Sequence, residues 1–186
     1  MAKKFLTFDV VASDNQGDPD QPASFSLQAG DTASAPYLVG GKLVFPEGDS
    51  TFDISFELQD RTTDLDLEFL RRGDDAIWIG NDAACPPAPP GDPGNGSPDI
   101  IIGSVSATKK KLRIDNWNVD PATLSFMLRF QSKRTGKLVE YDPIIENGGG
   151  GKPSLLRPKG VFAALLGLLA IVGIGVATNR GRRKGD

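Results

Sequence analysis

The chain has 186 residues, no histidine and one cysteine. Histidine-dependent triads and histidine-ligated metals are therefore excluded, as are an intrachain disulfide and a thiolate zinc cluster. The net charge of −3 divides into −12 over residues 1–104, +3 over 105–148 and +6 over 149–186. Because phosphate binding needs a basic face, the acidic part argues against a nucleic-acid partner.

The N-terminus does not have the pattern of a secretory signal. Two lysines and a short apolar run come first, but Asp9 and Asp14 interrupt the run before it reaches a useful length. We therefore expect the bulk of the chain to stay in the cytoplasm.

Residues 3–145 are predicted to be β structure throughout. Segments 52–58, 64–69 and 124–130 alternate apolar and polar residues with period 2, which is typical of strands with one buried face. Turn-forming clusters separate further candidate strands at 4–12, 23–28, 36–45, 76–80, 99–106, 111–116 and 137–142. Roughly ten short strands and no helical period predict a mainly β fold, an antiparallel β-sandwich over residues 1–147.

Two tryptophans and a proline-rich insertion stand out in this domain. Trp78 and Trp117 are expected to cap the core, because indole brings a large apolar area and one donor. The alternative is a platform on which a ligand stacks. Residues 83–98 hold six prolines and three glycines, and are expected to form a surface loop. Cys85 in this loop is either a free thiol without function or a reactive or lipidated residue.

Acidic residues suggest two kinds of chemistry, each with a simpler explanation. Two loops offer carboxylate oxygens of the kind calcium prefers, although their spacing is not that of an EF-hand and solvated turns have the same composition. These carboxylates are Asp14, Asp18 and Asp20 in one loop, and Asp74, Asp75 and Asp82 in the other. Asp64, Asp66 and Glu68 resemble the paired carboxylates of glycoside hydrolysis, but any exposed acidic strand face does so too. We assign no catalytic residue, metal or cofactor, and expect no enzyme.

Basic residues cluster at a strand entry and at a hairpin tip. Together they are suited to anionic lipid headgroups, or they are charges that protect a sheet edge from aggregation. The residues are Lys109, Lys110, Lys111 and Arg113 at the strand entry, and Lys133, Arg134 and Lys137 at the hairpin.

Residues 124–147 combine an amphipathic strand, a Thr-Gly hairpin and the ending Asp142-Pro143-Ile144-Ile145-Glu146-Asn147. This ending is similar to the Asp-Pro-x-hydrophobic-x-Asn ending of the DP-EP family of small uncharacterised bacterial β-sandwich proteins. The resemblance implies a β-sandwich and a bacterial source, and no activity. The proline-rich loop has no place in the family pattern. By its own chemistry, Pro143 is expected to end the last strand and Asn147 to close the turn that follows.

Composition changes abruptly after Asn147. Glycines 148–151 predict a flexible hinge within a linker at 148–159. Residues 160–178 are uncharged, and as a helix they span roughly 28 Å, close to a bilayer core. The basic tail 179–186 follows. This pattern predicts one C-terminal transmembrane helix, since the alternative of a buried core helix normally has a polar face.

Three sets of residues carry this anchor prediction. The membrane anchor is assigned to Gly160, Phe162, Leu165, Leu169, Ile171 and Ile174. Small residues four apart let helices approach closely, and helix–helix packing is assigned to Ala163, Gly167, Gly173 and Ala177. Contact with lipid headgroups, or control of topology, is assigned to Lys159, Arg180, Arg182, Arg183 and Lys184. The tail charges oppose the positive-inside rule, yet we expect a cytoplasmic domain, because the opposite topology must export it without a signal.

Two classes of function are favoured. One is a membrane-anchored, non-enzymatic scaffold that recruits an unknown protein partner through a sheet edge or the proline-rich loop. The other is a membrane-acting effector whose helices self-associate and perturb the lipid bilayer. A calcium- or carbohydrate-binding sandwich is a third, weaker class.

Overall fold

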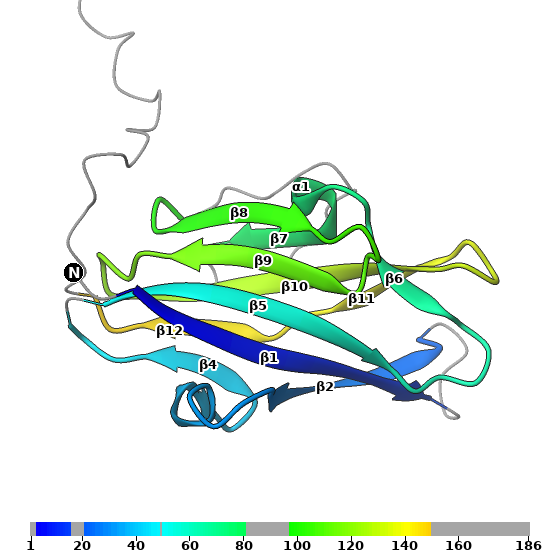
Figure 1. Ribbon diagram of the computed structural model, residues 1–186, viewed down its shortest axis with the longest axis horizontal. Helices are drawn as coiled ribbons and strands as arrows, with labels where there is room; N and C mark the ends of the chain where they lie inside the picture. Colours follow the sequence, from blue (N-terminus) through cyan, green and yellow to red (C-terminus); the bar gives the residue numbers. More distant parts are fainter. Residues whose placement is uncertain (1–2, 16–20, 49, 81–96, 150–186) are drawn as a thin grey trace, which may run out of the picture. The chain divides into compact units, whose positions relative to one another are not determined.

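The computed structural model describes residues 3–15, 21–48, 50–80 and 97–149, and this part of the protein is mainly β, as predicted (Figure 1). Its strands form two sheets. The first sheet contains β1 (Lys3–Asp14), β2 (Ala23–Ala29), β5 (Thr51–Asp60), β8 (Ile100–Val105) and β9 (Lys111–Asn116), in the order β2-β1-β5-β9-β8.

The second sheet is built around one long strand, β10 (Ala122–Ser132). On one side β10 pairs with β6 (Leu67–Phe69) and β7 (Ile77–Gly80), and on the other with β11 (Leu138–Tyr141) and β12 (Ile144–Asn147). Beyond β12 lie β4 (Lys42–Phe45) and β3 (Leu38–Val39). Two short helical turns, η1 (Ala35–Tyr37) and α1 (Gly73–Ala76), complete the described elements.

Both sheets are mixed, so the prediction of purely antiparallel sheets is wrong. β1 runs parallel to β5, and β12 runs parallel to β4. The chain passes into the second sheet for β3 and β4 before it returns as β5, and this crossover lets β5 lie beside β1 in the same direction. Local alternation of residues does not encode such a crossover.

The two sheets share one hydrophobic core. Phe52, Ile54 and Phe56 of β5 are at most 1% exposed, which confirms the predicted buried face of that strand. Aromatic rings from opposite sheets are in contact: the Phe56 and Phe126 centroids lie 5.5 Å apart, and those of Phe45 and Phe52 4.6 Å apart. Truncating such a ring to alanine typically costs about 3–5 kcal/mol.

Three local predictions differ from the structure. The strand expected at 36–45 is a helical turn followed by the β3–β4 hairpin, whose turn uses the positive φ angles of Gly40 and Gly41. The strand expected at 64–69 is limited to β6, because Asp66 adopts a φ of 47° just before it. Pro143 does not end the last strand, since it lies between β11 and β12, which both pair with β10.

Several predictions lie outside the described residues. They concern the anchor at 160–178 and its assigned residues, the tail at 179–186, and most of the loop at 83–98, with Cys85. Within the described ranges, no helix has the length and apolar character needed to cross a membrane.

Candidate functional site

The acidic strand face and the basic patch, which the sequence presents as separate features, meet in the structure. They form a set of ion pairs that we call the β6 charge cluster. Its members are Asp64, Asp66, Glu68, Lys109, Lys110, Lys133 and Arg134.

Each carboxylate of the cluster has a basic partner. Lys109 Nζ lies 2.5 Å from Glu68 Oε1, and Arg134 Nη1 lies 3.1 Å from Asp64 Oδ1. Lys133 Nζ lies 3.0 Å from Asp66 Oδ2. A hydrogen bond from Lys133 lowers the pKa of Asp66, and the same contact raises the pKa of Lys133. A general acid needs a raised pKa, so the pairing of Asp66 favours a structural role over glycoside hydrolysis.

Backbone contacts explain why the cluster forms at β6. The Phe69 N–H donates to the carbonyl of Lys109, in the turn between β8 and β9, at 2.8 Å. The Lys133 N–H, in the turn after β10, donates to the carbonyl of Asp66 at 3.1 Å. β6 is therefore held between turns of the two sheets, and its acidic side chains meet the lysines of both.

The position and pairing of these cations do not favour the lipid hypothesis. Lys111 and Arg113 are also paired, with Glu57 and Asp53. The cluster adjoins the end of β10 at Ser132, whereas the described residues end beside Ala122, the register partner of Asn147. Eleven residues of strand separate these ends by about 35 Å.

A second ionic network, which was not predicted from the sequence, lies on the outer face of the first sheet. Asp53 is 3% exposed and accepts two hydrogen bonds from Arg113, with Nε 2.6 Å from Oδ1. Lys3 Nζ lies 3.2 Å from Asp53 and 3.0 Å from Asp115. Burial acts to raise the pKa of Asp53, but the hydrogen bonds from Arg113 and Lys3 outweigh it and the pKa is lowered. Opposite charges on facing strands were the signal from which this ionic network could have been predicted.

The outer face of the second sheet is also buried around β10. Alternation predicts an exposed Arg129, yet it is 0% exposed, with its Nε 3.4 Å from Glu140 Oε1. Trp78 is 5% exposed and alternates with the core residues of β7, so it projects away from the core that it was predicted to cap. Its ring covers Gly80, and Trp117 also lies outside the core cluster.

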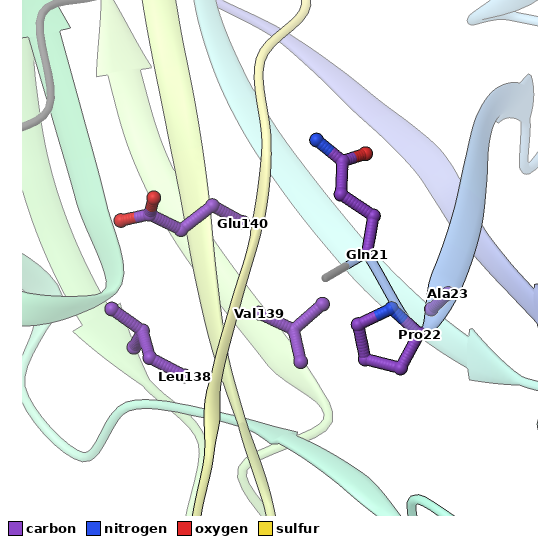
Figure 2. Close-up of a pocket in the computed structure, with 6 residues that line it drawn as sticks. All are labelled: Gln21, Pro22, Ala23, Leu138, Val139 and Glu140. Atoms are coloured by element: carbon purple, nitrogen blue, oxygen red, sulfur yellow. The ribbon is translucent and has the colours of Figure 1, made fainter. Parts of the chain in front are cut away.

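A small pocket opens where β2 and β11, edge strands of opposite sheets, approach one another (Figure 2). Its volume is about 150 Å³, and Figure 2 shows Val139 turned toward Pro22, with Leu138 and Glu140 on the other side of their strand. Ligand pockets usually measure about 300–1,000 Å³. This one suits a single aliphatic side chain.

A buried amide network lies where the described chain ends. Asn147 was predicted to close a turn, but it pairs with Asn116 of the opposite sheet. Asn118 Oδ1 accepts the Gly149 N–H at 3.1 Å, and the Gly148 N–H donates to the Phe45 carbonyl at 2.6 Å. The first two glycines of the predicted hinge are therefore bound to the domain.

The calcium hypothesis gains no support from the described residues. Asp14 accepts hydrogen bonds from the backbone and side chain of Thr63, which lower its pKa. Asp74 and Asp75 lie in α1, while the other three candidate carboxylates fall outside the described ranges. No group of three or more carboxylates in those ranges is arranged to hold a metal ion.

The chain matches no protein-family model, and it matches no curated protein. The resemblance of residues 124–147 to the DP-EP family stays a prediction.

Proposed function

We propose that this protein is a membrane-anchored, non-enzymatic β-sandwich that recruits a protein partner to the membrane. The observation that carries the proposal is the uncharged segment at 160–178, followed by a basic tail. Such a segment has the length and composition of a single membrane span. Ten residues, 150–159, separate this segment from Gly149, the last described residue, which is hydrogen-bonded to the domain.

The chemistry of the domain supports binding rather than catalysis. Carboxylates that resembled a catalytic pair are tied to lysines and an arginine, and the pocket has room for one side chain. An extended peptide that adds to a sheet edge gains main-chain hydrogen bonds and places alternate side chains in such small pockets. We propose that the partner binds in this way along the edge of β11, with the domain on the cytoplasmic side.

Fractionation of cells tests the anchor. We would compare the full chain with a chain that ends at Gly149, because ending at Asn147 removes the contacts of Gly148 and Gly149 with the domain. The full chain should resist carbonate extraction from membranes, and the short chain should be soluble and folded. Release of the full chain by carbonate would contradict the proposal.

The effector hypothesis differs in what it requires of the anchor. Small residues four apart favour close helix packing. Replacing Gly167 or Gly173 with leucine should leave partner recruitment intact if the protein is a scaffold. The same changes should abolish membrane perturbation if assembled helices are the active species. Dye release from vesicles measures that perturbation directly.

A further inference from the structure

Strand β2 is an edge of the first sheet that carries neither a charge nor a bulge. Residues 21–30, QPASFSLQAG, carry no charge, and β2 pairs with β1 in continuous register without a bulge. Edge strands normally avoid further pairing through charges, bulges, prolines or short length. Among the described edges, β8 has a register irregularity, β3 has two residues, and β11 is a short strand that carries Glu140.

The hydrogen bonds at the two ends of the β1–β2 ladder show which backbone groups face outward. The Gly30 N–H donates to the Thr7 carbonyl at 2.8 Å, and the Asn15 N–H donates to the Pro22 carbonyl at 3.2 Å. Bonded and non-bonded pairs alternate along an antiparallel ladder. The residues whose backbone groups point away from β1 are therefore Ala23, Phe25, Leu27 and Ala29.

This outward edge has no partner strand in the part of the chain that the structure describes. One of its donors, the Leu27 N–H, is met by the hydroxyl of Tyr141. The side chains of Ser24, Ser26 and Gln28 beside it are exposed and uncharged. The edge is thus uncharged, and a strand that pairs with it displaces the Tyr141 hydroxyl from the Leu27 N–H.

We propose that β2 pairs with β2 of a second copy of this chain, antiparallel and about a two-fold axis at Ser26. The strand is self-complementary in this register. Phe25 lies opposite Leu27 of the second copy and Ala23 opposite Ala29, so apolar residues meet on the core side. The outward backbone groups of both copies then pair, with the Leu27 N–H exchanging the Tyr141 hydroxyl for a carbonyl of the second copy. The inference goes beyond the proposed function and does not depend on the anchor.

Charge favours a second copy over a foreign peptide. The strand offers no charge for a peptide to complement, and in this register no acidic residue faces another, since Asp31 lies opposite Gln21. Residues 1–148 nevertheless carry a net charge of −9, so two copies repel at long range. Salt screens that repulsion, and pairing should increase with ionic strength.

Disulfide trapping in the full chain, with Cys85→Ser as background, tests the register. At the axis Ser26 faces itself in a non-bonded pair, where Cα atoms lie about 4.5 Å apart and a disulfide fits. Ser26→Cys should therefore yield a cross-linked dimer on mild oxidation. Ser24→Cys should not, because its own copy lies about 13 Å away along the strand. A mixture of the Ser24→Cys and Gln28→Cys chains should cross-link to each other, and this arm also serves if Ser26→Cys fails to fold.

The second arm of the test introduces charge at the two-fold axis. Adding Ser26→Glu to both chains of the mixture places two carboxylates opposite one another, and should lower cross-linking at least several-fold. Ser104→Glu, on the exposed face of the opposite edge strand β8, is the matched control and should leave cross-linking unchanged. Equal cross-linking of Ser24→Cys and Ser26→Cys, or no cross-linking at Ser26 and in the mixture, overturns the proposal.

Discussion

Asn116 and Asn147 exchange two side-chain hydrogen bonds between the sheets, with donor–acceptor distances of 2.7 and 3.2 Å. Asn116 belongs to β9 of the first sheet and Asn147 to β12 of the second, and both are buried. The side-chain oxygen Oδ1 of Asn116 also accepts the Asn118 N–H at 2.9 Å. A satisfied amide pair of this kind joins the sheets where the described chain ends.

Removing the Asn147 amide should reveal the free-energy cost of burying the Asn116 amide without its partner. Asn147→Ala leaves the Asn116 amide buried without its partner, and should lower the free energy of unfolding by about 2 kcal/mol. Urea denaturation, followed by tryptophan fluorescence, measures the change. Gln28→Ala, on an exposed face, is the control and should stay within about 0.5 kcal/mol. A similarly small effect for Asn147→Ala would show that the pair does not stabilise the domain.

Gly80 should not tolerate a side chain. A Cβ atom there would lie 2.2 Å from the Trp78 ring, so Gly80→Ala should cost about 1–3 kcal/mol through overpacking. The smaller ring of Trp78→Phe should relieve part of that cost. A double-mutant cycle measures the relief as a coupling between the two positions. Strict additivity would mean that the cost of Gly80→Ala does not arise from contact with the Trp78 ring.

Asp53 should make the domain sensitive to acid. Its pKa in the folded state is below its ordinary value of 3.8, so the unfolded state binds more protons. The stabilisation is therefore complete above about pH 4 and is lost as the pH falls through the folded-state pKa. Asp53→Asn should cost about 2 kcal/mol at neutral pH and reduce the loss of stability below pH 4. The comparison uses the urea midpoints of the unaltered chain and of Asp53→Asn between pH 7 and pH 2. An acid profile that is the same in both would contradict the prediction.

The members of the β6 charge cluster should contribute unequally to the stability of the domain. Glu68 is 15% exposed and Asp66 is 44% exposed. Asp66→Asn should therefore cost little, because solvent screens its pairs. Glu68→Gln should cost more, about 1–2 kcal/mol. Both costs should shrink in high salt, and the reverse order of the two variants would show that burial does not control these pairs.

The lipid hypothesis for this cluster is tested separately. Lys133→Ala and Arg134→Ala remove cations that already have carboxylate partners. We expect both variants to co-sediment with anionic vesicles as the unaltered full chain does, within a factor of about two. A clear loss of vesicle binding would show instead that the basic patch binds the membrane surface.

The mainly β fold was predictable because alternation in β5 is a local property of the chain. In β10 the same alternation misled, since Ser125, Met127 and Arg129 on the predicted exposed face are buried. A period of two shows that the faces differ, but not whether something covers the second face. The charge cluster and the Asn116–Asn147 pair could not be predicted from one sequence, because each joins elements far apart in the chain.

Local chemistry by itself determined the buried face of β5 and the exclusion of histidine-dependent chemistry. Only the tertiary structure decided that β1 and β5 run in parallel, that Lys109, Lys133 and Arg134 of the basic patch pair with Glu68, Asp66 and Asp64, and that β2 is left as an uncharged edge. The physical reason is the range of the interactions. Strand propensity and turn geometry act over a few residues, whereas crossovers and ion pairs between sheets form only once distant segments have packed together.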